Sequence, residues 1–421
     1  MSLIPPSIVL SASICLAAPA NYDEAKVGAY TLPELLKQSD GKRVTTPEQW
    51  TAQRRGEVLA LVMDEEYGRP PKKLDDLRFD VTSVNRAALG GKATRKIVHI
   101  SLEKHPAWGG FDLMLYTPNA VGKRAPAFLG LNFDGNHAAS TEADVPAPRQ
   151  WARLHASGHD NDAEALRGKE SSRWPIELAI SRGYAVATAW YCEIEPDRIG
   201  GWKDGLRGAV TRDGAAPAWD AQRDWSAIGA WAWALGRALD YLETDPDIDA
   251  RRVAVLGHSR LGKTALWAGA SDPRFAIVIS NDSGEGGAAL ARRNFGETIE
   301  SMREPFPHWF CAKHWSWIGR VNEMPIDQHF VVALCAPRPV YIASASEDQW
   351  ADPKGEFLAG KAAEPVYALF GKRGLVVADW PQPDTPVGDT IGYHLRTGKH
   401  DMTEYDWTQY LNFADRHNGK R

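Results

Sequence analysis

Short apolar runs recur along the chain, and most are separated by segments long enough to form a helix. Strands of a parallel sheet read this way, because helices cover both faces of the sheet and leave few polar positions. The pattern therefore predicts an α/β protein with a mostly parallel sheet. The expected strands are residues 96–102, 111–116, 126–131, 184–189, 253–256, 275–279 and 339–343.

Three segments have the periodicity of amphipathic helices: residues 47–61, 220–244 and 403–417. Two further segments, 133–172 and 193–222, are rich in Gly, Pro, Asp and Trp and predict long loops. Loops of this length in a compact α/β protein usually cover a functional site or are disordered.

Composition narrows the possible classes. The chain has 421 residues, 43% of them hydrophobic, which is enough for one elaborated domain with a large core. Its net charge of −5 argues against a nucleic-acid partner or an anionic membrane surface. The 17 tryptophans are numerous for this length, and either a Trp-rich core or a sugar-binding cleft would explain them.

The first twenty residues predict a signal peptide: an apolar stretch is followed by small residues that end at Ala20. The basic start of such a signal is missing. We therefore expect a secreted or periplasmic protein whose residues 21–421 form a single catalytic domain. Removal of the signal leaves three cysteines, an odd number, so no disulfide framework is indicated. The four cysteines are Cys15, Cys192, Cys311 and Cys335.

The octet Gly257–Thr264, "GHSRLGKT", fits two different chemistries. It satisfies the phosphate-binding P-loop pattern GxxxxGK[ST]. It also nearly satisfies the nucleophile elbow GxSxG of serine hydrolases, with Ser259 as the nucleophile and the second glycine one position late. Both motifs require a buried strand before the octet and a helix after it, and the sequence predicts both.

The P-loop interpretation has some support, because Phe275–Asp282 is an apolar strand that ends in an acid, as a magnesium-binding strand would. Against it, some 250 residues with strands of their own precede the octet. The four residues between Gly257 and Gly262 are also bulky or polar, which hinders backbone amides from wrapping a phosphate. The sequence therefore favours the hydrolase interpretation, with a nucleotide-binding protein as the remote alternative.

A serine hydrolase of this type needs an acid and then a histidine later in the chain. His400 is favoured as the histidine, because it lies in a glycine-marked loop just before the last helix. It would accept the proton of Ser259, and the acid would orient its ring. The candidate acids, which follow the next two strands, are Asp282, Glu347, Asp348 and Asp352. The other histidines later in the chain are His394 and His417.

The residue after the nucleophile usually supplies a backbone N–H to the oxyanion, and here it is Arg260. Its guanidinium would add a charged donor. The alternative is that Arg260 and Lys263 are surface cations, but the helix dipole disfavours cations at a helix N-terminus, and this favours a functional role.

Several separated motifs resemble the bacterial branch of the glucuronoyl esterases, carbohydrate esterase family 15. The resemblance covers roughly the last two thirds of the chain, and the motifs occur in the family's order. The family's nucleophile motif, GxSRxGK, has the same displaced glycine. The matching segments are "GHSRLGK" (257–263), "NDSGEGG" (281–287), "FPHWF" (306–310), "SASEDQWADPKGEF" (344–357) and "IGYHLRTGKHD" (391–401).

The resemblance implies an α/β-hydrolase fold, a three-layer sandwich with long inserted loops around the active site. It implies that Ser259 is the nucleophile, His400 the general base and Arg260 the oxyanion stabiliser. It further implies that Lys263, Glu297 and Trp350 contact the sugar. From the residues alone, a solvated helix acid and a core aromatic would be the simpler interpretations of Glu297 and Trp350.

The triad acid stays open between two residues. Many family members have a Glu after the strand that follows the elbow, where this chain has Asp282. Others use an Asp after a later strand, which here is Asp348. We favour Asp348, because α/β-hydrolases generally place their acid there, and Asp282 would then assist or order the site.

The expected activity is hydrolysis of esters of (4-O-methyl-)glucuronic acid, as in links between xylan and lignin, through an acyl-enzyme. Another carbohydrate esterase, such as an acetyl xylan esterase, is the alternative. We expect no metal and no organic cofactor, no nucleic-acid or membrane partner, and a monomer.

Overall fold

The computed structural model describes residues 20–419, apart from 71–73, 75, 121, 123, 156–161 and 213–223. The predicted signal peptide therefore lies outside the described residues except for Ala20, and so does Cys15. Cys192, Cys311 and Cys335 are buried and free.

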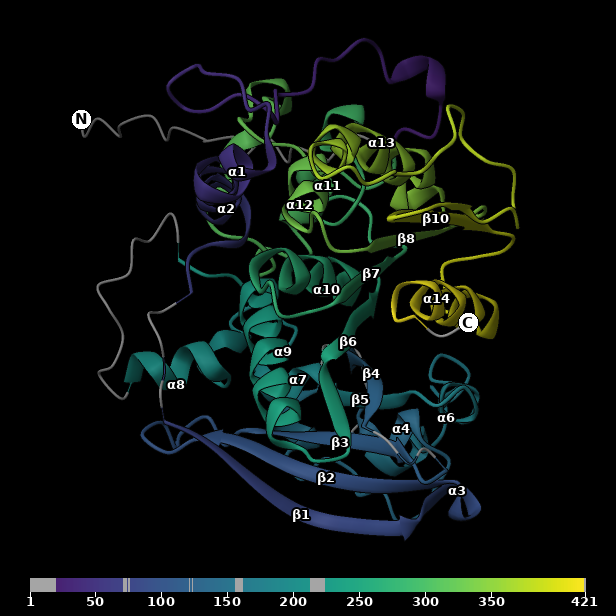
Figure 1. Cartoon of the computed structure of the whole chain (residues 1–421). Helices are drawn as coiled ribbons and strands as arrows, with labels where there is room; N and C mark the ends of the chain where they lie inside the picture. The colour runs from purple at the N-terminus through teal and green to yellow at the C-terminus, as the bar shows by residue number, and fades with distance from the viewer. Residues whose placement is uncertain are drawn as a thin grey trace, which may run out of the picture.

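A ten-stranded sheet forms the centre of the molecule (Figure 1). Its order is β1-β2-β3-β5-β4-β6-β7-β8-β10-β9. The six strands from β5 to β10 in this order are parallel, whereas β1, β2 and β3 at one edge and β9 at the other pair antiparallel. The strands are β1 Leu77–Ala87, β2 Ala93–Leu102, β3 Phe111–Pro118, β4 Ala125–Asn132, β5 Ala185–Trp190, β6 Ile248–His258, β7 Ile277–Asn281, β8 Val340–Ala345, β9 Val387–Gly388 and β10 Ile391–Arg396.

Neighbouring residues of the central strands enter different cores. Phe128 and Ala254 belong to one hydrophobic cluster, whereas Leu129 and Val255 belong to the other. Helices α9 and α10 cover one face, and α6 and α14 cover the other (Figure 1). The helices are α1 Pro47–Gln49, α2 Arg55–Val62, α3 Ala88–Gly91, α4 Asn136–Ala139, α5 Trp151–Leu154, α6 Ile176–Ser181, α7 Tyr191–Ile194, α8 Leu206–Arg212, α9 Ala227–Thr244, α10 Arg260–Ser271, α11 Ile299–Arg303, α12 His329–Leu334, α13 Pro353–Leu369 and α14 Glu404–His417.

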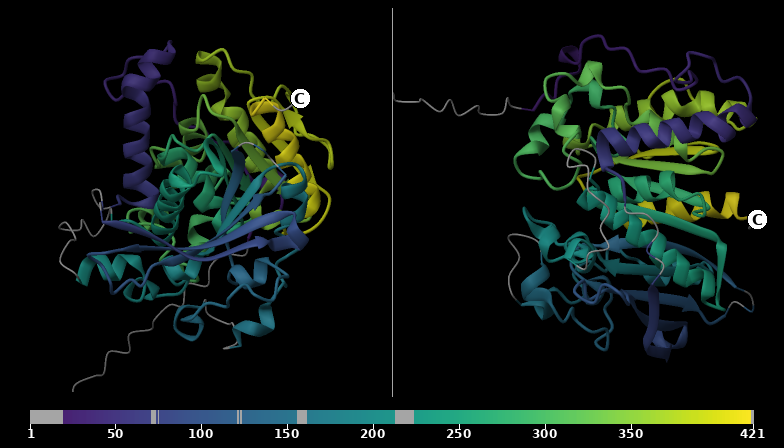
Figure 2. Two further views of the ribbon diagram at one scale, coloured as in Figure 1. Left: turned by 60° about the horizontal axis from the view of Figure 1, so that its bottom comes forward. Right: turned by 90° about the vertical axis from the view of Figure 1, so that its left-hand side faces the viewer.

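The predicted parallel sheet and its seven strands are confirmed. The pattern missed β1, which lies at the sheet edge and is mostly exposed, and the short β9. It also missed β10, whose buried residues include His394 and Arg396. β1 and β2 extend across the end of the molecule away from β8 and β10 (Figures 1 and 2).

Three predicted segments need correction. The long loop 133–172 contains α4 and α5, and the loop 193–222 contains α8, because short helical turns between glycines and prolines leave little periodicity in the sequence. The helix predicted to start at Asp220 begins at Ala227 instead, where Ser226 accepts the N–H of Gly229 as its N-cap. Residues 220–223 lie outside the described residues.

The described tryptophans lie mainly in the core, which answers the question raised by their number. Trp202 and Trp350 are the large exceptions, with 39% and 38% exposure. In the described part of the chain, no helix has the length and apolar character needed to cross a membrane.

Candidate active site

Ser259 occupies a strained turn between a buried strand and a helix. β6 ends at His258 and α10 begins at Arg260, so Ser259 alone connects them. Its backbone has φ 57° and ψ −132°, a region that costs a residue with a side chain about 1–3 kcal/mol. One connecting residue cannot wrap a phosphate, which takes a loop of several amides. The P-loop alternative is therefore wrong, and the turn has the geometry of a nucleophile elbow.

The two glycines of the octet allow this close turn. A Cβ atom on Gly257 would lie 1.9 Å from the carbonyl oxygen of Leu261, which is an outright overlap. A Cβ atom on Gly262 would lie 2.8 Å from the carbonyl oxygen of Asn281. The second glycine thus lies where α10 packs against the end of β7, and this contact explains its late position in the motif.

His400 lies in the loop between β10 and α14. Arg396, the last residue of β10, donates from Nη2 to the carbonyl oxygens of Lys399 and Asp401, at 2.8 and 2.9 Å. These bonds fix the backbone on both sides of His400. The ring of His400 lies 4.5 Å from the ring of His258, between centroids, and so reaches the end of β6 next to Ser259.

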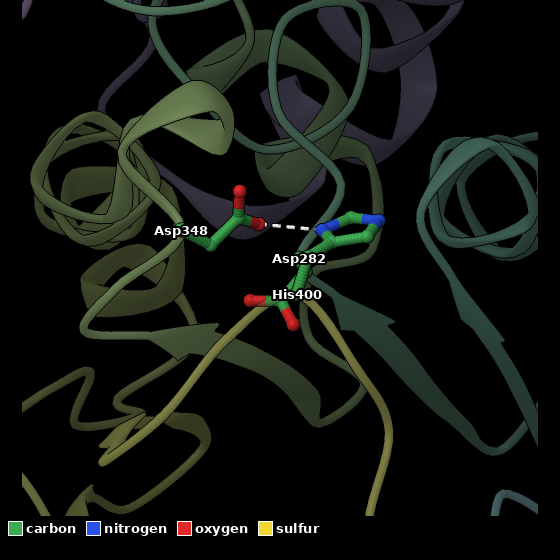
Figure 3. A group of neighbouring side chains, drawn as sticks. All are labelled: Asp282, Asp348 and His400. Atoms are coloured by element: carbon green, nitrogen blue, oxygen red, sulfur yellow. Dashed lines mark hydrogen bonds and ion pairs between the residues drawn. The ribbon is translucent and has the colours of Figure 1, made fainter.

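His400 is paired with Asp348. Its Nδ1 atom lies 2.6 Å from Oδ2 of Asp348 (Figure 3). Asp348 comes three residues after β8 and its side chain is 5% exposed, whereas the His400 side chain is 40% exposed. A buried carboxylate on one ring nitrogen holds the histidine in the tautomer that leaves the other nitrogen free to accept a proton. The structure thus joins two of the residues expected to form a triad.

Asp282 lies close to this pair but in a different environment. A carboxylate oxygen of Asp282, a carboxylate oxygen of Asp348 and a ring nitrogen of His400 all lie within 4.8 Å of one another (Figure 3). The Asp282 carboxyl is buried, and neither of its oxygens has a hydrogen-bond partner among the described residues. Burial and the neighbouring carboxylates of Glu356 and Asp348 raise the pKa of Asp282 well above its usual value. An environment that disfavours the charged carboxylate weakens its ability to stabilise an imidazolium, and Asp348 is the one of the two that hydrogen-bonds His400, so Asp348 is favoured as the acid.

The same three residues have the spacing of a metal site. Two features disfavour metal binding: Asp348 and His400 form a hydrogen bond with each other, and burial disfavours the ionised form of Asp282 that would bind a metal.

The remaining candidate acids and histidines have structural partners. His394 is buried between Asp406 and Tyr341, and His417 contacts the carbonyl oxygen of Asp389. Asp352 caps α13 and pairs with Arg293. Glu347 is exposed.

Arg260 is anchored by residues from other parts of the chain. Its Nη1 donates to the buried carboxylate of Asp197, and its guanidinium carbon lies 4.8 Å from the ring centroid of Trp309. Asp197 also accepts hydrogen bonds from His308 and Trp309. Asp197 was not predicted from the sequence; its only signal was that "FPHWF", which holds two of its partners, is one of the family's motifs.

Lys263 and Glu297 form a buried pair one turn along α10 from Ser259. The Lys263 ammonium donates at 2.6 Å to the Glu297 carboxylate and, at the same distance, to two backbone carbonyl oxygens. Lys263 is therefore no surface cation. Its three N–H groups are used within the protein, so it holds Glu297 in place. Burial raises the pKa of Glu297, and the ammonium opposes this shift.

Trp350 is next to this pair. Its backbone carbonyl accepts the N–H of Glu297 at 2.7 Å, while its indole is 38% exposed. Trp350 follows Asp348 by two residues, and its backbone holds Glu297. Lys263 in turn connects Glu297 to α10.

Comparison with known proteins gives consistent results. The family model described as "Glucuronyl esterase, fungi" matches residues 218–371. A glucuronoyl esterase structure from Solibacter usitatus is 49% identical, with a TM-score of 0.88, over 93% of this chain and 99% of that one.

Two curated relatives agree. A carbohydrate esterase named MZ0003, from an unknown prokaryotic organism, is 47% identical over 401 residues, which are 94% of this chain and 92% of the relative. A 4-O-methyl-glucuronoyl methylesterase from Schizophyllum commune is 27% identical over 386 residues, 86% of this chain and 81% of the relative. The α/β-hydrolase fold is therefore confirmed, and the chain is a carboxylic ester hydrolase that belongs to the glucuronoyl esterases of carbohydrate esterase family 15.

Proposed function

We propose that this chain hydrolyses esters of the carboxyl group of (4-O-methyl-)glucuronic acid through an acyl-enzyme on Ser259. The contact between His400 and Asp348, beside the strained turn of Ser259, carries the proposal. These side chains supply a nucleophile, a base and an orienting acid, so the reaction needs no metal or organic cofactor.

In the first half-reaction, Nε2 of His400 accepts the hydroxyl proton while Oγ of Ser259 attacks the ester carbonyl carbon. Asp348 stabilises the imidazolium that forms. The negative charge that develops on the carbonyl oxygen is stabilised by the Arg260 backbone N–H and guanidinium. The tetrahedral intermediate then collapses, His400 protonates the leaving alcohol, and the glucuronoyl group stays on Ser259.

In the second half-reaction, water replaces the alcohol. His400 accepts a proton from this water, and the hydroxide attacks the acyl carbon. Collapse of the second intermediate breaks the bond to Ser259, which takes its proton back from His400. The products are the free sugar acid and the enzyme in its starting state.

Glu297 and Trp350 would recognise the sugar. A carboxylate accepts hydrogen bonds from ring hydroxyls, and an exposed indole offers a flat apolar surface to a pyranose ring. Relatives named 4-O-methyl-glucuronoyl methylesterase support this substrate class. We extend the proposal to ester links between xylan glucuronate and lignin alcohols, cleaved by a monomer exported through the signal at residues 1–20.

A direct comparison of substrates tests the proposal. We expect the protein to hydrolyse methyl 4-O-methyl-glucuronate with a kcat/KM at least about a hundredfold above that for acetylated xylose. Only in the glucuronate ester does the reacting carbonyl belong to the sugar acid. The loss of two hydrogen bonds between enzyme and sugar would give a ratio of about this size. The reverse preference would instead identify an acetyl xylan esterase. Steady-state titration of the released acid measures both rates.

The sugar contact is tested at Glu297. Glu297→Gln keeps the shape of the side chain but removes its charge, and we expect KM for the methyl glucuronate ester to rise about tenfold or more, since a hydrogen bond to a charged group contributes about 1.5–3 kcal/mol. Hydrolysis of p-nitrophenyl acetate, which has no sugar hydroxyls, should stay within about twofold.

Glu300→Gln provides the matched control, because Glu300 is exposed on the neighbouring helix α11. It should change neither substrate's kinetics. An equal loss of activity on both esters in Glu297→Gln would show that Glu297 supports the fold of the site and does not contact the sugar.

A further inference from the structure

Asp197 collects hydrogen bonds from three separate parts of the chain. It follows α7 in sequence, and its side chain is 1% exposed. Its carboxylate accepts from the Tyr191 hydroxyl at 3.0 Å, from His308 Nε2 at 2.7 Å, from Trp309 Nε1 at 2.8 Å and from Arg260 Nη1. A carboxylate has about four acceptor sites, so this one is fully occupied.

The surroundings keep this carboxylate charged. Burial opposes ionisation, but the hydrogen bond from His308 and the positive charge of Arg260 outweigh it and hold the pKa of Asp197 well below the usual range. Arg260 therefore always faces an anion in the enzyme.

Aromatic rings fix the other sides of the Arg260 guanidinium. Its carbon lies 4.8 Å from the ring centroid of Trp309, 5.6 Å from that of Phe306 and 5.9 Å from that of Phe133. Phe306 and Trp309 stack on each other, with 3.8 Å between centroids and 7° between planes. Rings at these distances attract the charge of the guanidinium and help to hold it in place.

The anchoring leaves donors for a ligand. Arg260 has five N–H groups, and Asp197 takes one through Nη1. The Nε atom is buried and has no acceptor among the described residues. A buried donor without a partner is costly in the free enzyme, but an anionic oxygen would satisfy it.

We propose that Asp197 is a positioning residue for the reaction: it holds the Arg260 guanidinium so that its remaining N–H groups face the developing oxyanion. The inference rests on the proposed function. Asp197 acts through Arg260 and touches no substrate. Preorganised donors lower the barrier because they need no reorientation when the charge appears.

Asp197→Asn tests this role. The amide keeps the size of the carboxyl but removes its charge and turns one acceptor into a donor that faces Arg260. We expect kcat to fall about tenfold to a hundredfold, which is less than the fall caused by removing an oxyanion donor altogether. KM should change less than about threefold.

Glu195→Gln is the matched control. Glu195 lies two residues earlier, its side chain is also 1% exposed, and it binds Arg207 at 2.7 and 2.9 Å instead of Arg260. Folded Glu195→Gln should retain kcat within about threefold. An equal loss in both variants would mean that Asp197 only supports this loop.

A double-mutant cycle separates positioning from general damage. Asp197→Asn added to Arg260→Ala should lower kcat by less than about twofold beyond Arg260→Ala alone. A full tenfold or larger further loss would overturn the proposal. If Asp197→Asn does not fold, Tyr191→Phe removes one donor to Asp197, and its loss of kcat should likewise vanish in the Arg260→Ala background.

The cycle can be measured on p-nitrophenyl acetate as well as on the glucuronate ester. If the protein hydrolyses p-nitrophenyl acetate but not the glucuronate ester, the proposed substrate is wrong. The double-mutant cycle on p-nitrophenyl acetate would still test the role of Asp197. Failure of the two proposals is thus distinguishable.

Discussion

Ser259→Ala should lower kcat for methyl 4-O-methyl-glucuronate by about 10⁶, because the variant has no oxygen to form the acyl-enzyme. The backbone donors and Arg260 remain, so binding of the ester should change little. Steady-state kinetics of acid release measures kcat. Mass spectrometry should detect a glucuronoyl adduct on the wild type, trapped by acid quench, and none on Ser259→Ala.

Ser259→Gly is the matched variant for the same position. It lacks the hydroxyl as well, so its activity should be equally low. Its thermal unfolding, however, should show a stability about 1 kcal/mol or more above that of Ser259→Ala, because glycine adopts the backbone angles of Ser259 without strain. Substantial turnover by either variant would show that another residue is the nucleophile.

Asp348→Asn should lower kcat by about 10³ to 10⁴, because an amide at this position favours the wrong tautomer of His400 and cannot stabilise its charged form. The 2.6 Å contact between His400 Nδ1 and Asp348 makes this the second largest effect that we expect. The measurement is kcat on the glucuronate ester, with circular dichroism to verify folding.

Asp282→Asn is the comparison that decides the acid. Burial and neighbouring carboxylates raise the pKa of Asp282, which favours its neutral form, and asparagine has nearly the same shape as a neutral aspartic acid. We therefore expect kcat within about tenfold of the wild type. If Asp282→Asn abolishes turnover and Asp348→Asn leaves it intact, the assignment of the acid is wrong.

The sheet was predictable because its strands are buried on both faces. Their short apolar runs, such as Val253–Leu256, differ from the periodicity of helices even without neighbours. β1 was not predictable in this way, since an exposed edge strand carries little apolar signal. β10 was hidden for the opposite reason, because its buried His394 and Arg396 are polar and find their partner, Asp406, in α14.

The octet shows where a local pattern is insufficient. Its residues satisfy the P-loop motif and nearly satisfy the nucleophile elbow, and the two motifs differ in how many residues connect the strand to the helix. The structure leaves Ser259 alone between them, since Gly257 and Gly262 allow the backbone to approach Leu261 and Asn281 closely. The close approach of Gly262 to Asn281 depends on the packing of α10 against β7.

The sequence by itself determined the α/β class, the strand before Ser259 and the loop position of His400, because these depend on local periodicity and on turn residues. Only the tertiary structure distinguished Asp348 from Asp282. Both follow a strand, but Asp348 hydrogen-bonds His400, whereas the buried Asp282 has no hydrogen-bond partner among the described residues and its pKa is raised by burial and by neighbouring carboxylates. It alone placed Asp197 against Arg260, 63 residues away in the chain. Hydrogen bonds and pKa values depend on the groups that surround a side chain in space, and no local pattern records those groups.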